Sequence, residues 1–88
     1  MPKRKNELEA MIRSEPFAYR AAYDSSNNVQ YEGWAVPGSA TSAANWVIAR
    51  HTYDSSNNLT ATEWATPSSG PAANFDQIWD NRTSLTYI

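Results

Sequence analysis

The sequence contains one stretch twice, as AYDSSNN at residues 22–28 and as TYDSSNN at residues 52–58. Asp is favoured at the first position of a turn, because its carboxylate can accept the backbone N–H two residues further on. Asn27 and Asn57 fall where such hairpins need a left-handed residue, and Asn is the best choice there after Gly. Hairpin geometry therefore explains the stretch, which predicts type I turns that begin at Asp24 and Asp54.

The repeat extends beyond the loop. Sliding the chain by thirty positions also superimposes Trp34 on Trp64. The two units are residues 17–46 and 47–75. Two copies are too few for a solenoid, which needs at least three repeats. They predict a closed, pseudo-symmetric β-domain.

Four segments have the alternation and the β-formers of strands: residues 17–23, 29–36, 46–53 and 59–66. The closing segment, residues 75–88, is ambiguous. Phe75, Ile78, Trp79 and Arg82 lie at helical spacing, whereas Leu85 and Tyr87 alternate. By analogy with residues 46–53, we expect a strand, broken near Asp80–Asn81.

The first sixteen residues differ in character from the rest. Asn6 followed by Glu9 forms a capping box, and Pro16 would end the helix. So short a helix is unstable alone and must dock on its own sheet or on a neighbour. The residues predicted to bind a partner are the basic start and the apolar stripe: Lys3, Arg4, Lys5, Leu8, Met11 and Ile12.

The chain of 88 residues has the length of one domain and contains no Cys. The fold class that follows is mainly β: a small antiparallel β-sandwich or barrel-like sheet built from two repeated hairpin units. A helical arm, residues 1–16, precedes the β-domain of residues 17–88. No apolar run approaches the roughly 20 residues of a membrane helix, and no signal peptide is expected.

Composition argues against several functions. The net charge is −2, and no basic stripe is present, so nucleic acid is not an expected partner. His51 is the single His, and the Ser residues fall in turns and connections. Asp76 and Asp80 flank Trp79, where solvating a strand end explains them better than catalysis does. We expect neither enzymatic activity nor a cofactor.

Two features keep alternatives open. Each YDSSNN loop could bind Ca²⁺ through its oxygens, but one Asp per loop is few for an ion that takes six to eight oxygen ligands. Trp34 and Trp64 could form a sugar-stacking platform. We favour the interpretation that they belong to the core or to a subunit interface, with the other large aromatics, Trp46 and Trp79.

Three stretches, TYDSSNNLTATEWA, VPGSATSAANWVI and FDQIWDNRTSLTY, resemble small virion-associated proteins of tailed bacteriophages. Those proteins carry paired Tyr-Asp-Gly-Ser-Gly-Asn-like hairpins and a closing Trp-Asp-Asn-Arg segment. The resemblance covers residues 17–88, with Asn27 and Asn57 at positions of the loop Gly. It implies a place in the virion and no catalytic residues.

The function expected from these observations is a non-enzymatic structural component of a phage particle, at its head, neck, tail or fibre. Its expected partners are other virion proteins and further copies of itself, with neither nucleic acid nor membrane. One alternative is a small carbohydrate-binding module that uses Trp34 and Trp64. Another is a regulatory binding protein made during infection.

Overall fold

The computed structural model describes residues 17–66 and 74–88. The predicted helical arm, with its partner-binding residues, lies outside the described residues. Residues 67–73, in the connection that follows Trp64, also lie outside the described residues.

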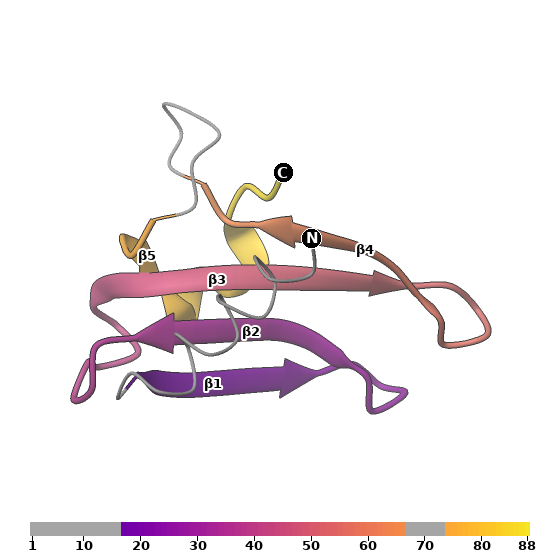
Figure 1. Cartoon of the computed structure of the whole chain (residues 1–88), viewed down its shortest axis with the longest axis horizontal. Coiled ribbons are helices and arrows are strands. Elements are labelled where there is room, and N and C mark those ends of the chain that lie inside the picture. Colours follow the sequence, from indigo (N-terminus) through magenta and orange to yellow (C-terminus); the bar gives the residue numbers. More distant parts are fainter. Residues whose placement is uncertain (1–16, 67–73) are drawn as a thin grey trace, which may run out of the picture.

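The described chain forms an antiparallel sheet with a short helix beside it (Figure 1). Strands β1 to β4 neighbour one another in sequence order, and β5 pairs with β3 beside this path. The mainly β, antiparallel fold class is confirmed. The elements are β1 (Ala18–Tyr23), β2 (Val29–Ala35), β3 (Ala44–Tyr53), β4 (Leu59–Trp64), β5 (Gln77–Ile78) and η1 (Trp79–Ser84).

The closing segment corrects one prediction. We expected a strand over residues 75–88, but only Gln77–Ile78 is a strand, and Trp79–Ser84 is a 3-10 helix. The helical turn places the guanidinium of Arg82 4.7 Å from the centre of the Trp79 ring. The segment forms a helical turn and not a longer strand because the buried Trp79 side chain anchors it in the core.

The core lies on the side of the sheet where β5 and η1 pack (Figure 1). The rings of Trp46 and Trp79 meet there, with centroids 6.0 Å apart. Gly33 lets Trp79 approach the sheet, because a Cβ at this position would lie 2.6 Å from Trp79 Cε3. The buried apolar residues of this core are Tyr31, Ala35, Trp46, Ile48, Ala65, Trp79 and Tyr87.

The two repeated loops have the same local geometry. Asp24 Oδ1 accepts the backbone N–H groups of Ser26 and Asn28, at 2.8 and 3.0 Å. Asp54 Oδ1 accepts the N–H groups of the equivalent residues in the second loop, both at 2.9 Å. Asn27 and Asn57 have φ of 64° and 66°, the left-handed conformation that the turn interpretation requires.

Candidate functional site

The two loops lie at the same end of the sheet, because alternate hairpins of an antiparallel meander, here β1–β2 and β3–β4, turn at the same end (Figure 1). Asn28 Nδ2 donates a hydrogen bond to Asn57 Oδ1 at 2.9 Å. Asn28 is the last Asn of the first loop, whereas Asn57 is the first Asn of the second loop. Two identical loops therefore meet through non-equivalent residues, and together they line one site.

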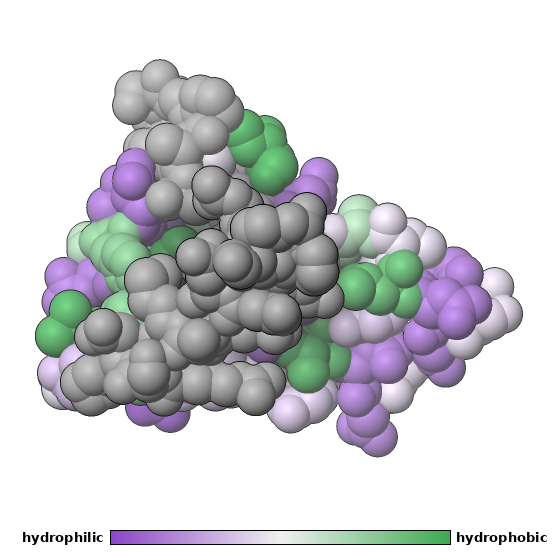
Figure 2. Space-filling model, viewed as in Figure 1, coloured by the Kyte–Doolittle hydropathy of each residue, from purple (hydrophilic) through white to green (hydrophobic). Residues whose placement is uncertain are grey.

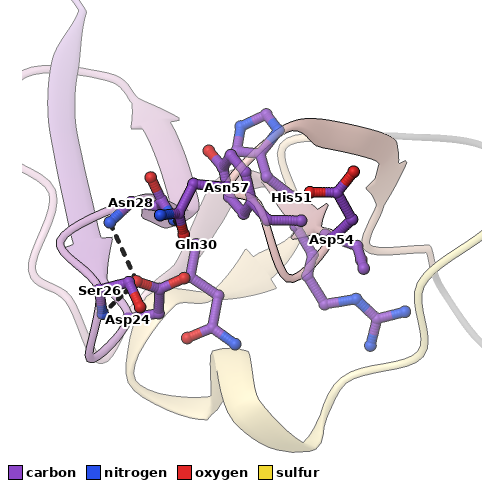
Figure 3. A pocket seen from close by; sticks show the side chains of 10 residues that line it. Asp24, Ser26, Asn28, Gln30, His51, Asp54 and Asn57 are labelled. Carbon is purple, nitrogen blue, oxygen red and sulfur yellow. Dashed lines mark hydrogen bonds between the residues drawn. The ribbon is translucent and has the colours of Figure 1, made fainter.

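A polar hollow of about 460 Å³ opens between these loops (Figure 3). It forms because β2 and β3 stop pairing before they reach the loops. The paired residues run from Trp34 with Val47 to Tyr31 with Arg50, and both strands continue beyond the last pair. We call this space the loop hollow. Its lining includes Asp24, Asn28, Gln30, Arg50, Asp54 and Asn57.

Each carboxylate of the loop hollow accepts hydrogen bonds within its own turn. The backbone N–H of Asn58, and after it the Ser56 N–H and the Asn58 side chain, hold the pKa of Asp54 below its ordinary value. Across residues 17–66 and 74–88, no group of three or more His, Asp or Glu side chains is placed to share a metal ion. The Ca²⁺ alternative gains no support from this geometry.

On the opposite side from the core, one side chain from each of four strands joins a hydrogen-bond chain. Tyr19 on β1 donates to Glu32 Oε2 on β2 at 2.6 Å. Glu32 Oε1 lies 2.5 Å from His51 Nε2 on β3, and His51 Nδ1 lies 2.8 Å from Thr62 Oγ1 on β4. We call this side of the sheet the open face, and the four residues the cross-strand network.

Part of the cross-strand network has the order of a catalytic triad, with a carboxylate, an imidazole and a hydroxyl. Acyl transfer also needs N–H donors aimed at the developing oxyanion, beside a place for substrate. Thr62 is an exposed residue within β4 and is absent from the lining of the loop hollow. The arrangement links the four strands to one another through their side chains.

The open face also carries a row of aromatic rings, Tyr19, Trp34 and Trp64, which we call the aromatic row. The ring centroids of Tyr19 and Trp34 are 5.6 Å apart, and those of Trp34 and Trp64 are 6.0 Å apart. Tyr19 is 50% exposed, and both Trp residues are partly buried. The four Trp residues thus divide between the core, which holds Trp46 and Trp79, and the open face.

The remaining candidate residues do not come together. Asp76 Oδ1 accepts a hydrogen bond from its neighbour Gln77 at 2.8 Å, and Asp80 is exposed. The sequence reasoning missed the cross-strand network and the contact between the loops. The thirty-residue repeat carried a signal for the second of these, since the turns of the β1–β2 and β3–β4 hairpins lie at the same end of the sheet.

No family model matches this chain, and no curated protein and no solved structure matches it. Its function must therefore be argued from its own residues. Within the described ranges, no helix has the length and apolar character needed to cross a membrane.

Proposed function

We propose that the protein is a non-enzymatic structural subunit of a bacteriophage particle, which assembles with further copies of itself through the open face of its sheet. The aromatic row is the observation that carries the assembly part of this proposal. The setting in a phage particle is supported by the resemblance of residues 17–88 to virion-associated proteins.

The composition of the open face suits a protein interface. Tyr and Trp are enriched among the residues that dominate binding energy, because they bury large rigid surfaces at low entropic cost. Polar groups buried without partners would oppose binding. Here the hydroxyl of Tyr19, the carboxylate of Glu32 and both ring nitrogens of His51 already have partners.

A second copy is the occupant that we propose. Most soluble oligomers are formed by identical chains, and a two-fold contact brings the same patch of each subunit together. An 88-residue chain also buries a smaller share of its surface than a large domain does. Pairing two open faces would bury the aromatic row, which lies outside the core on the opposite side of the sheet.

The exposed tyrosines of β1 provide a matched test. Tyr19 belongs to the aromatic row, whereas Tyr23, 61% exposed, stands beside the first loop. In sedimentation velocity of the full chain, we expect self-association that Tyr19→Ser weakens at least tenfold and that Tyr23→Ser leaves unchanged. A chain that stays monomeric at every concentration would contradict the assembly proposal, as would equal effects of the two substitutions.

Carbohydrate binding at Trp34 and Trp64 is the second candidate, since neither indole is fully buried. It predicts that added glycans quench Trp fluorescence and that Trp34→Ala abolishes the quenching. The third candidate, a regulatory protein made during infection, differs in location, because such a protein would be absent from purified particles.

A further inference from the structure

The loop hollow is a second feature that the assembly role does not use. We propose that it binds a neutral, hydroxyl-rich ligand, namely one or two sugar residues of a saccharide. This site is distinct from the aromatic row, and the inference does not depend on where the protein assembles.

The paired amides of the loop hollow suit a sugar hydroxyl. An amide side chain has a donating NH₂ group and an accepting oxygen. The bond from Asn28 Nδ2 to Asn57 Oδ1 leaves two further groups of this amide pair, the Asn28 Oδ1 acceptor and the Asn57 Nδ2 donor. One hydroxyl can donate to the first atom and accept from the second, as neither a simple cation nor a simple anion can.

Further polar groups stand around this amide pair. Gln30 also lines the hollow and offers a third amide (Figure 3). Asp24 uses Oδ1 for both N–H groups of its turn, so its second carboxylate oxygen can accept from the ligand. The lining therefore offers both donors and acceptors, which suits a sugar ring because each of its hydroxyls can donate and accept.

Charge and polarity disfavour the other ligand classes. The carboxylates of Asp24 and Asp54 repel anions, and the charge of Arg50 is balanced by Glu63, whose Oε1 lies 2.5 Å from Arg50 Nη2. Figure 2 shows hydrophilic residues gathered at the loop end of the molecule, which offers little to an apolar ligand. A neutral ligand with many hydroxyls remains the best match.

The size of the loop hollow is compatible with this ligand. Its volume of about 460 Å³ falls within the roughly 300–1,000 Å³ of small-molecule sites. The space is partly open to solvent at the loop end of the sheet. It can therefore admit the end of a longer glycan, with one or two sugar residues held between the loops.

The duplicated sequence supplies its own control. Ser26 lines the loop hollow, whereas the equivalent Ser56 does not, although both are exposed and stand in the same DSSNN context. Ser26→Tyr should block the site, and Ser56→Tyr should leave it open. Gln30→Leu, which removes a polar group from the lining without altering a turn, provides a second and independent variant.

The experiment titrates the isotope-labelled full chain with glucose, galactose, mannose and N-acetylglucosamine, and with their short oligomers, and follows the backbone amide signals by NMR. We expect at least one saccharide to give saturable shifts at residues 26, 28, 30 and 57. Gln30→Leu and Ser26→Tyr should each weaken that binding at least tenfold, and Ser56→Tyr should not. Dispersed spectra of the variants establish that they remain folded.

Three results would overturn the inference. The first is the absence of saturable shifts with every saccharide tested. The second is a set of shifts centred on Trp34 and Trp64 and unaffected by Gln30→Leu, which would move carbohydrate binding to the aromatic row. The third is an equal loss of binding in the Ser26→Tyr and Ser56→Tyr variants. None of these results bears on self-association, so the assembly proposal stands or falls separately.

Discussion

Trp34 and Trp64 stand thirty residues apart at equivalent positions of the repeat, and their ring centroids lie 6.0 Å apart on the open face. They come from β2 and β4, the two strands that flank β3. Ala49, the residue of β3 that pairs with Trp64, is small and buried, so that the two indoles can approach each other across the central strand. The duplication thus produces one pair of indoles and not two separate sites.

The first prediction concerns the energy of this pair. Aromatic pairs contribute about 0.5–1.5 kcal/mol beyond the area that they bury. A double-mutant cycle with Trp34→Leu and Trp64→Leu should therefore give a coupling free energy of about that size in urea unfolding. Strictly additive effects of the two substitutions would mean that the rings do not interact in solution.

The second prediction concerns the contact between Gly33 and Trp79. A Cβ at Gly33 would lie 2.6 Å from Trp79 Cε3 and 3.1 Å from Trp46 Cε3. Overpacking of this kind costs about 1–3 kcal/mol, so Gly33→Ala should lower the free energy of unfolding by that amount. Gly38→Ala is the comparison, because nothing lies within 4 Å of its Cβ and only its φ of +86° is strained.

A smaller side chain at position 79 should reduce the destabilisation caused by Gly33→Ala, but not the destabilisation caused by Gly38→Ala. Combining Gly33→Ala with Trp79→Leu should cost less than the sum of the two separate losses in urea unfolding, because the shortened side chain relieves the clash. Gly38→Ala with Trp79→Leu should be additive. If the two glycines behave alike, Trp79 does not pack against the sheet as described.

The third prediction concerns the left-handed positions of the loops. Asn57 has φ of 66°, where a β-branched side chain is strongly disfavoured. Asn57→Val should lower the free energy of unfolding by about 1–2 kcal/mol, whereas Asn57→Gly should be tolerated. Ser55→Val, at an ordinary φ in the same turn, is the control in thermal unfolding, and an equal loss there would contradict the turn assignment.

The fourth prediction concerns acid stability. Because the pKa of Asp54 is lowered in the folded chain, its carboxylate stabilises the fold above its ordinary pKa of 3.8. This contribution is lost as the pH falls through the folded-state pKa. The difference in Tm between the wild type and Asp54→Asn should therefore be largest near neutral pH and should shrink below about pH 4. A difference that is constant over this range would contradict the turn geometry of Asp54.

The fifth prediction concerns the cross-strand network at high pH. Partial burial, followed by the hydrogen bond to Glu32, raises the pKa of Tyr19 above its ordinary value of 10.0. Folding then favours the protonated phenol, so its contribution is present below about pH 10 and is lost as the pH rises further. Burial also raises the pKa of Tyr87, so ultraviolet titration should show two late-ionising phenols. Tyr19→Phe should remove one of them, whereas Tyr23→Phe should leave both in place.

Much of the fold followed from the repeat, because hairpins are specified locally. Asp24 and Asn27 fix a turn through their own side chain and backbone, and the same residues recur thirty positions later. Alternation likewise placed Tyr31 and Trp34 on opposite faces of β2. These features depend on sequence neighbours, so sequence reasoning could reach them.

The remaining features depend on contacts between distant segments. The 3-10 helix of Trp79–Ser84 follows from the packing of Trp79 on Gly33, a relationship with no local signature. The cross-strand network needs the register of four strands, and a shift of one residue would turn its members to the other face. The loop hollow likewise depends on where the β2–β3 pairing stops.

The central proposal, a structural place in a phage particle, is tested most directly by peptide mass spectrometry of phage particles purified from a lysate that contains this chain. Trypsin should release the peptides 21–50 and 51–82, because Arg20, Arg50 and Arg82 bound them. We predict that both peptides copurify with the particles at a constant ratio to the major virion proteins, also after a high-salt wash. Their absence from particles, together with their presence in the lysate of infected cells, would contradict the claim.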